Sequence, residues 1–577
     1  MTGKRVMAAI FALSLLACAQ EEKTGADLLI RNARVYTVDE TRPWADAVAV
    51  HGDEIVWVGA EAEASAYRDE GTEVIDAQGR LLLPGFIDSH NHIRYGNEPD
   101  SVDLSGAGDL TTVQATIREF ASAHPELPWI FGGGWLYTAF SGDGLPRAEY
   151  LAGLTQGRPA FFISYDAHTA WLNTEAMQAI GLEAGSALAA EEEVMVDPES
   201  GAPTGVIREV VSLGDANRAM KRLGEKFPDG DRLARSLDAS LLQALGYGIT
   251  TVIAPQTSLD ELDTFVSARD AGTLQARVQT ALFHPVGTPA SDLPAFAAAM
   301  KALDDDRLRV SAIKLYVDDV IEAHTAAMLD PYSDQPEESG ETLYSPEAFR
   351  DLVVRLDGAG HQLFIHAIGD RGVRVALDAL EHAQTVNGQR NSRHQIVHAE
   401  LVAPEDQPRF AELGVTACMQ PRHVLPESNG QWVNAVGPER VRYAFPWKSL
   451  QAQGARLAFS SDWDVSEMNP LIGIYSAVTR QGLGGEAPGG WIPEERVDLE
   501  TAVRAYTVDG AYANFAERNR GSIRVGHYAD LILLSSNLFE IPPSEFLKTQ
   551  VDLTWVGGEL VYRRIPPATT SSDSELP

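Results

Sequence analysis

The chain has 577 residues, of which 44% are hydrophobic, so it can bury a large core and is longer than a typical single domain. Its 82 acidic residues outnumber its 46 basic residues and give a formal net charge of −36. This charge argues against nucleic acid or an anionic membrane surface as a partner, because phosphate binding needs clustered lysine and arginine. We therefore expect two or three structural units in a soluble, acidic chain.

The N-terminus has the pattern of an export signal, which we assign to residues 1–18. Basic residues precede an apolar run over residues 6–17, which is too short to remain as a membrane-spanning helix. The run ends in LLAC, which resembles a bacterial lipoprotein signal whose cysteine, here Cys18, becomes lipidated. A plain signal peptide cut near Ala17 or Ala19 is the alternative. We expect an exported protein on the periplasmic side, held to the membrane by a lipid anchor.

Short strands with glycine turns are predicted near both ends of the chain. The segments ADLLIRNARVYTVD and ADAVAVHGDEIVWVG, within residues 26–83, alternate apolar and polar residues as hairpin strands do. The segments GSIRVGHYADLILLS and VDLTWVGGELVYR, within residues 519–564, have the same pattern. We interpret the two ranges as parts of one small β-sandwich. Residues 565–577, rich in proline, serine and threonine, are predicted to be disordered.

Apolar strand-like runs alternate with helix-like segments through the centre of the chain, and Ser345 with Glu347 marks one helix start. Such repeats predict an α/β fold, a (β/α)₈ TIM-like barrel over residues 84–108 and 236–518, with its chemistry at the carboxyl ends of the strands. The stretch 109–235 interrupts the rhythm with glycine-rich turns and aromatic residues. We expect it to be an insertion after the first barrel strand that partly covers the pocket. The predicted later strands are YGITTVIA, ARVQTALF, RVSAIKLYVD, HQLFIHAIGD, HQIVHAE, GVTACMQ and ARLAFSSDWD.

Candidate metal ligands lie in or just after these runs. His90 and His92 in LLLPGFIDSHNHI are two residues apart, and such residues share one face of a strand, so both rings can reach one ion. Taken alone, this H-x-H pair is a weak signal. Lys314 lies inside the apolar run SAIKLYVDD, where a bare ammonium is costly to bury without a partner. The alternative is a lysine that reaches solvent from the strand end.

Three further runs close in residues that can bind metal. His366 ends QLFIH, His398 ends HQIVH, and Asp462 follows LAFSS. The carboxyl ends of parallel strands meet at one edge of a sheet, so these side chains and the earlier ones are expected to share a site. The order along the chain is therefore a histidine pair, a lysine, two single histidines and an aspartate.

The motifs PGFIDSHNH, IKLYVDD, HAIGDRGV, VHAE and SSDWDV together resemble those of the amidohydrolase superfamily, and in particular its amidohydrolase-3 (YtcJ-like) family. The resemblance extends over nearly the whole mature chain and implies a barrel that carries one or two divalent metal ions. It assigns His90 and His92 to the more buried ion, a carboxylated Lys314 as a bridge, and His366 and His398 to the second ion. It assigns Asp462 to the first ion and to proton transfer.

These residue types suit the chemistry that the resemblance implies. Imidazoles and carboxylates favour Zn²⁺, and a carboxylated lysine offers two oxygens and removes the ammonium charge. We expect a metal-activated water to hydrolyse a non-peptide C–N bond in a small-molecule amide substrate. A cyclic amidase or deaminase that acts on heterocycles is an alternative, and a non-catalytic metal-binding barrel is another. The complete ligand set argues against the last of these.

Two more histidines are candidates for the pocket. His168, in SYDAHTAWLN, lies in a segment that also resembles the family, and its imidazole could hold the substrate carbonyl or the oxyanion, so we count it with Asp462 as a catalytic candidate. A structural role in the core of the insertion is equally compatible with the sequence. His324 follows the Lys314 strand and could also reach the pocket.

Overall fold

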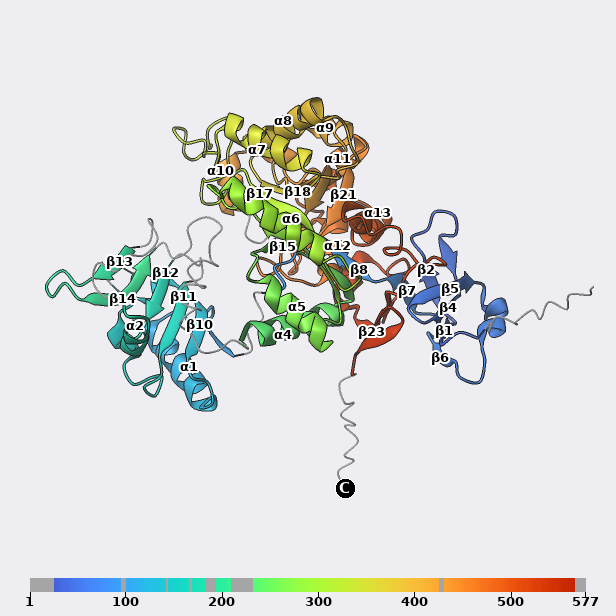
Figure 1. Cartoon of the computed structure of the whole chain (residues 1–577), viewed down its shortest axis with the longest axis horizontal. Coiled ribbons are helices and arrows are strands. Elements are labelled where there is room, and N and C mark those ends of the chain that lie inside the picture. Colours follow the sequence, from blue (N-terminus) through green and yellow to red (C-terminus); the bar gives the residue numbers. More distant parts are fainter. Residues whose placement is uncertain are drawn as a thin grey trace, which may run out of the picture.

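The computed structural model describes residues 25–94, 100–141, 144–164, 169–182, 193–208, 232–424 and 430–565. The predicted lipidation site, Cys18, and the catalytic candidate His168 both lie outside these ranges. None of the described helices is long and apolar enough to cross a membrane. Figure 1 shows a central barrel with one smaller sheet-containing part on either side of it.

The barrel is a sheet of eight parallel strands, in the order β21-β20-β19-β18-β17-β16-β15-β8. The amide of Ser89, just after β8, donates a 3.3 Å hydrogen bond to the carbonyl oxygen of Phe459 at the end of β21, and so connects the first strand with the last. The seven later runs predicted from the sequence all become barrel strands, which confirms the predicted fold class. The strands are β8 (Phe86–Asp88), β15 (Ile249–Thr257), β16 (Arg277–Phe283), β17 (Leu308–Tyr316), β18 (Gln362–Ala367), β19 (Gln395–His398), β20 (Thr416–Met419) and β21 (Arg456–Phe459).

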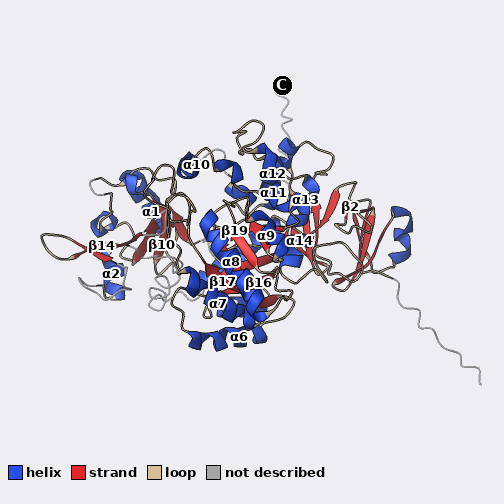
Figure 2. Cartoon of the chain, turned by 90° about the horizontal axis from the view of Figure 1, so that it is seen from above, coloured by secondary structure: helices blue, strands red, loops and turns tan. Residues whose placement is uncertain are grey.

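Helices alternate with these strands and cover the barrel (Figure 2). The predicted helix start at Ser345 is confirmed, because its side chain accepts a hydrogen bond from the amide of Ala348 and caps the helix that follows. The helices are α4 (Arg232–Gly246), α5 (Leu262–Ala271), α6 (Leu293–Ala302), α7 (Pro346–Gly358), α8 (Asp370–Asn387), α9 (Gln407–Glu412), α10 (Gly430–Val436), α11 (Trp447–Ala452), α12 (Pro470–Thr479), α13 (Leu499–Ala505) and α14 (Val508–Ala513).

Both ends of the described chain contribute to a β-sandwich. Strand β7 from the N-terminal part pairs with β22 from the C-terminal part, with Leu82 opposite Leu533, and the two sheets bury a common apolar core. One sheet has the order β5-β4-β1-β6 and the other β24-β23-β22-β7-β2-β3. Their strands are β1 (Leu28–Arg31), β2 (Arg34–Tyr36), β3 (Trp44–Ala45), β4 (Ala47–His51), β5 (Glu54–Gly59), β6 (Glu73–Asp76), β7 (Leu81–Pro84), β22 (Leu531–Leu534), β23 (Val551–Val556) and β24 (Glu559–Arg563).

A third sheet comes from the chain between β8 and β15, and both views place it on the side of the barrel away from the sandwich (Figures 1 and 2). Separate apolar clusters form around Trp171 and around Trp129, so this insertion has cores of its own. Its first strand, β9, lies within the range 84–108 that we assigned to the start of the barrel. The elements are β9 (Ser101–Asp103), α1 (Leu110–Ala123), β10 (Ile130–Trp135), β11 (Ala160–Ser164), β12 (Thr169–Leu172), α2 (Thr174–Ile180), β13 (Glu193–Val196) and β14 (Pro203–Arg208).

Candidate metal centre

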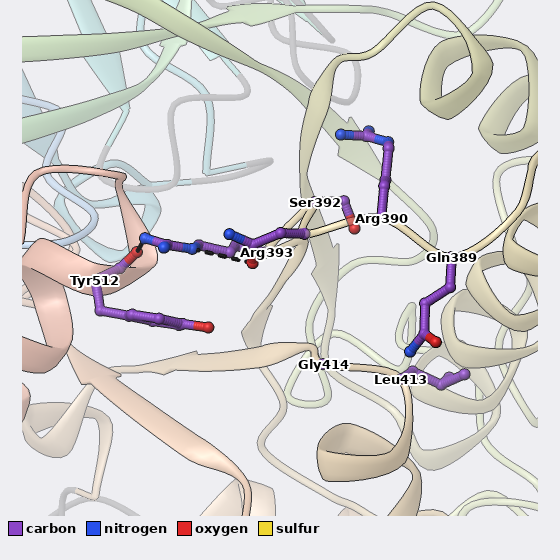
Figure 3. A pocket seen from close by; sticks show the side chains of 8 residues that line it. Gln389, Arg390, Ser392, Arg393, Leu413, Gly414 and Tyr512 are labelled. Carbon is purple, nitrogen blue, oxygen red and sulfur yellow. Dashed lines mark hydrogen bonds between the residues drawn. The ribbon is translucent and has the colours of Figure 1, made fainter.

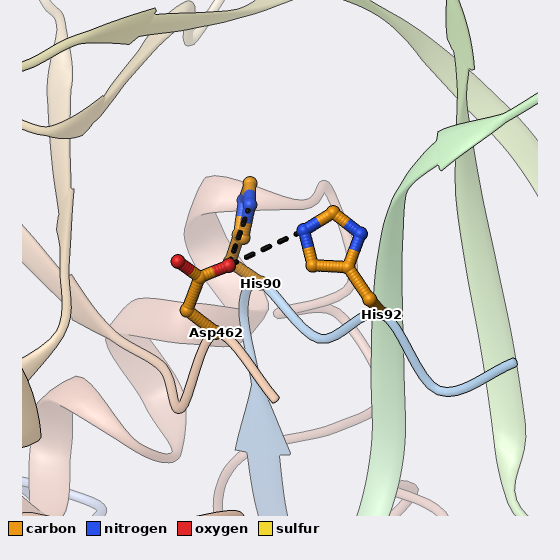
Figure 4. A group of neighbouring side chains, drawn as sticks. All are labelled: His90, His92 and Asp462. Atoms are coloured by element: carbon orange, nitrogen blue, oxygen red, sulfur yellow. Dashed lines mark ion pairs between the residues drawn. The ribbon is translucent and has the colours of Figure 1, made fainter. Parts of the chain in front are cut away.

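The histidine pair meets Asp462 at the carboxyl end of the barrel (Figure 4). One carboxylate oxygen, Oδ1 of Asp462, lies 3.3 Å from Nε2 of His90 and 3.3 Å from Nε2 of His92. The two histidines lie in the loop after β8, which ends at Asp88, and not on the strand itself as their spacing suggested. Backbone hydrogen bonds hold this loop against the one that follows β21, because the Asp462 amide donates to the His90 carbonyl over 2.8 Å.

The second oxygen of Asp462 faces another pair of histidines. Its Oδ2 lies 3.5 Å from Nε2 of His423 and 3.8 Å from Nδ1 of His398. Strand β19 ends at His398, and His423 follows β20, so the two rings also come from the carboxyl ends of strands. In each group of two histidines and Asp462, the candidate ligand atoms lie within 4.8 Å of one another.

Lys314 and His366 lie beside these groups on neighbouring strands, β17 and β18. The ring of His366 is 4.4 Å from that of His398 and stacks at 4.4 Å on Tyr316. The Lys314 side chain is completely buried, and its Nζ lies 4.6 Å from the centre of the Tyr316 ring. The ring of His90 lies 5.3 Å from that of His398. All six metal-ligand candidates therefore surround one end of the barrel.

Burial controls the charge of these groups. It lowers the pKa of His90 and of His366 well below the usual histidine range, and it lowers the pKa of His398 to about 3. Burial alone would raise the pKa of Asp462, but the surrounding histidines hold it well below its usual value. Burial also lowers the pKa of Lys314 to about 8. Near neutral pH the imidazoles of His90, His366 and His398 are thus neutral and the Asp462 carboxylate is ionised.

The residues present fit a divalent metal ion. Within the described parts of the chain, both ring nitrogens of His90, both ring nitrogens of His366 and the Lys314 amine are buried without a hydrogen-bond partner. Buried polar atoms are normally hydrogen-bonded, and five such nitrogens in one place need another partner. A cation that accepts imidazole lone pairs supplies one, and imidazole with carboxylate is the donor set that Zn²⁺ and similar ions prefer.

Groups behind the candidate ligands hold them in position. Asp88 accepts hydrogen bonds from the Ser461 amide (2.9 Å), the Ser461 hydroxyl (2.6 Å) and the Asn91 side chain (2.9 Å). This network connects the loop that carries His90 with the loop that carries Asp462. Such outer contacts orient the ligands of metal sites and tune their affinity.

The sequence analysis missed His423 and its partner Glu400. Glu400 Oε1 lies 3.1 Å from Nδ1 of His423, and Glu400 Oε2 accepts a 3.0 Å hydrogen bond from the Trp432 indole. A signal was present, because His423 closely follows the run GVTACMQ in the same way that Asp462 follows its own run. Burial alone would lower the pKa of His423, but Glu400 and Asp462 raise it.

The remaining candidate, His324, belongs to neither group of possible metal ligands. Its Nε2 pairs with Asp334 at 2.9 Å on the loop after β17. Its ring lies against Tyr332, with the ring centres 4.7 Å apart. The sequence could not distinguish this pairing, which is local, from a position in the pocket.

A separate hollow of about 400 Å³ lies at the other end of the barrel, where residues 391–393 and 414 precede β19 and β20 (Figure 3). Its two guanidinium groups are already paired, Arg390 with Asp357 at 2.8 Å and Arg393 with Glu517 at 2.7 Å. The Arg393 guanidinium also lies over the Tyr512 ring at 3.8 Å. These pairings leave the hollow without a cation for an anionic ligand, so we assign the chemistry to the opposite end.

Comparison with known proteins agrees with this geometry. A model of the amidohydrolase family matches residues 73–562. The chain is 31% identical to the Arabidopsis thaliana protein LONG AFTER FAR-RED 3, over 93% of this chain and 92% of that protein. It is 28% identical to an N-substituted formamide deformylase of Arthrobacter pascens, over 93% of this chain and 98% of the relative.

A solved structure shares the fold over most of its length. It is an uncharacterised metal-dependent hydrolase from Pyrococcus furiosus, 25% identical, with a TM-score of 0.71 over 90% of this chain and 99% of that chain. The family match covers the sandwich from β6 onward and the whole barrel, including every histidine and carboxylate of the candidate centre. The resemblance inferred from the motifs is therefore confirmed, and the chain belongs to the amidohydrolase family of metal-dependent hydrolases.

Proposed function

We propose that the protein hydrolyses the C–N bond of an open-chain amide, the acyl or formyl derivative of a small amine. The observation that carries this proposal is the position of Asp462, whose two oxygens face four histidine rings at the mouth of the barrel. A relative that spans 93% of the chain is named an N-substituted formamide deformylase, which supports an amide as the substrate class.

His90, His92 and Asp462 would hold one divalent ion, for which Zn²⁺ is the best match to the donor set. A divalent ion in such a site lowers the pKa of water to near neutrality and polarises a carbonyl oxygen. Carboxylation of Lys314 would provide two further oxygens beside His366 and His398. Burial favours that modification, because a pKa of about 8 leaves a larger share of the amine neutral, and the neutral amine is the form that reacts with CO₂.

Asp462 is assigned to proton transfer. The attacking water must lose a proton, and an amine leaves poorly unless it gains one, so one group has to face both. Asp462 is buried and ionised in its histidine surroundings, and it can therefore accept the proton and return it to the leaving nitrogen. We assign His168 to holding the carbonyl oxygen, where an imidazole donor would stabilise the developing negative charge.

The test is a substrate panel on enzyme loaded with Zn²⁺. The panel contains N-formyl and N-acetyl amines, N-acyl amino acids, cyclic amides and aminated heterocycles, and release of amine, acid or ammonia is measured. We expect turnover of open-chain amides that is lost on chelation and restored by Zn²⁺. A His324→Ala variant should retain this activity, because His324 pairs with Asp334 away from the centre. Turnover confined to cyclic amides or heterocycles would contradict the proposal.

We also propose export and a lipid anchor at Cys18, on the basis of the LLAC signal alone. The mass of the N-terminal peptide from membranes of the native host checks this. A chain that starts at an unmodified residue after Cys18 would contradict the anchor. A Cys18→Ser variant should appear in the soluble exported fraction.

A further inference from the structure

His423 has a buried ring whose two nitrogens face two different carboxylates. Nδ1 lies 3.1 Å from Oε1 of Glu400, and Nε2 lies 3.5 Å from Oδ2 of Asp462. Nε2 is buried and has no hydrogen-bond partner within the part of the chain that the structure describes. The ring therefore has one anchored nitrogen, and the other nitrogen is directed into the metal centre.

The anchor on Nδ1 determines which nitrogen can bind a metal. A carboxylate oxygen only accepts hydrogen bonds, so in the neutral ring Nδ1 of His423 donates its proton to Glu400 and Nε2 carries the lone pair that a metal can take. Histidine ligands of metal ions characteristically donate their other N–H to a carboxylate or amide oxygen. Glu400 is held in place by the indole N–H of Trp432.

A side-chain amide holds the neighbouring ring, His398. Its Nδ1 lies 2.9 Å from Oε1 of Gln420, and the Gln420 amide in turn donates a 2.9 Å hydrogen bond to the Ser460 hydroxyl. The same Nδ1 lies 3.8 Å from Oδ2 of Asp462, so His398, unlike His423, faces the carboxylate with the nitrogen that Gln420 holds, and its ligand atoms still lie within 4.8 Å of those of His423 and Asp462. The rings of His398 and His423 are nearly parallel, at 8°, with centres 5.9 Å apart.

We infer that His423 is a ligand of the metal centre, and that with His398 and Asp462 it forms a divalent-cation site next to the site of His90, His92 and Asp462. Glu400 is the positioning residue that keeps Nε2 of His423 directed at this site. The inference deepens the proposed function and rests on it for the presence of a metal. It changes the expected ligand set, because the motifs assigned the second ion to Lys314, His366 and His398 and left His423 out.

Metal counting on purified protein tests the inference without any substrate. Wild type and the variants His423→Ala and His324→Ala are stripped with chelator, reloaded with Zn²⁺ or Co²⁺, freed of unbound metal and analysed for metal per chain. We expect two ions in wild type and in His324→Ala, and one ion in His423→Ala. A Glu400→Gln variant should keep two ions, with the affinity for one of them lowered about 10-fold or more, as for other residues behind metal ligands. The visible spectrum of Co²⁺ should change in both His423→Ala and Glu400→Gln.

Two results would overturn the inference. One is wild-type metal content in His423→Ala, and the other is a single ion in wild type at saturating metal. Circular dichroism melting checks that the variants fold. If His423→Ala does not fold, anomalous diffraction from wild-type crystals loaded with Zn²⁺ decides the matter, since a ligating Nε2 of His423 must lie about 2.1 Å from an ion. A wild type that binds two ions but hydrolyses no amide contradicts the proposed function and leaves this inference intact.

Discussion

At the scale of single residues, the position of Asp462 is set by the loop after β21, and the strand pattern of the sequence could not predict where its side chain points. Strand β21 ends at Phe459, so Asp462 lies three residues beyond it, with a backbone φ of 56°. This left-handed conformation is uncommon for a residue with a side chain, and aspartate tolerates it better than most. The turn directs the carboxylate back over the barrel mouth, where it contacts rings from three different loops.

We predict that Asp462→Asn separates the two roles of this residue. Asparagine can still offer an oxygen to an ion but cannot carry the proton, so bound metal should persist while kcat falls by about 10² or more. Metal content and single-turnover rates measure the two effects. The control is Asp464→Asn, two residues further on and exposed, which should change kcat little. Near-normal kcat in a metal-loaded Asp462→Asn enzyme would exclude proton transfer by this group.

At the scale of elements, α7 is tied to the segment after α8 by a buried carboxylate. Asp357 lies in the last turn of α7, 2.8 Å from the Arg390 guanidinium and 3.1 Å from Nε2 of His394, and it accepts a 2.9 Å hydrogen bond from Asn387. Burial alone would raise its pKa, but His394, Asn387 and Arg390 together lower it to about 2. The contacts thus favour the ionised carboxylate in the folded state.

The sign of the resulting pH dependence follows from that shift. Above pH 4 the Asp357 carboxylate is ionised in folded and unfolded chains alike, and its contacts stabilise the fold fully. Between pH 4 and pH 2 the unfolded chain binds the proton first, so this stability is lost as the pH falls. We predict that Asp357→Asn lowers the melting temperature at pH 7. Between pH 4 and pH 2 the melting temperature of this variant should fall less steeply than that of wild type.

An exposed ion pair on the same layer of helices is the control for Asp357. Asp378 pairs with Arg409 at 2.7 Å, but its side chain is 61% exposed. Asp378→Asn should therefore lower the free energy of unfolding by less than about 1 kcal/mol. Removing one partner of a buried pair costs about 3–5 kcal/mol. Thermal melting of both variants from pH 2 to pH 7 compares them. An equal fall in melting temperature in the two variants would mean that burial does not set the strength of the Asp357 contacts.

At the scale of the whole molecule, a buried ion pair joins the sandwich to the barrel. Arg277, the first residue of β16, makes two hydrogen bonds of 2.8 and 3.0 Å to the Asp530 carboxylate just before β22. The backbone carbonyl of Asp530 also accepts a hydrogen bond from Gly85, between β7 and β8. The C-terminal part of the sandwich is therefore joined both to β16 and to the segment that leads into β8.

We predict that Arg277→Ala lowers the free energy of unfolding by about 3–5 kcal/mol, because it leaves the Asp530 carboxylate buried without its cation. Arg277→Met combined with Asp530→Leu should recover part of the loss, since no lone charge then stays buried. Arg269→Ala is the control, because its carboxylate partners Asp270 and Asp305 are largely exposed. Calorimetry measures the unfolding temperatures, and an Arg277→Ala protein as stable as the Arg269→Ala protein would contradict the prediction.

Much of the fold was predictable because its signals are local. The runs that became β15 to β21 are apolar segments of strand length, and the Ser345 cap is a contact between residues three apart. The candidate metal ligands that a motif carried, such as His90 and Asp462, were the ones that the sequence could bring forward. His423 was missed although it closely follows the run that became β20, and only the structure shows that Glu400 and Asp462 approach it from two other loops.

The sequence by itself determined the barrel, the β-strands at both ends, the family and most of the candidate ligands, since periodicity and short motifs are written in neighbouring residues. Only the tertiary structure decided which nitrogen of each ring faces Asp462 and that His324 pairs elsewhere. It also brought Arg277 to Asp530, 253 residues away. These features depend on distances between side chains from separate loops. In a buried site these distances also determine whether each group is charged. An ionised carboxylate or a neutral imidazole persists there only where neighbouring groups compensate for the lost water.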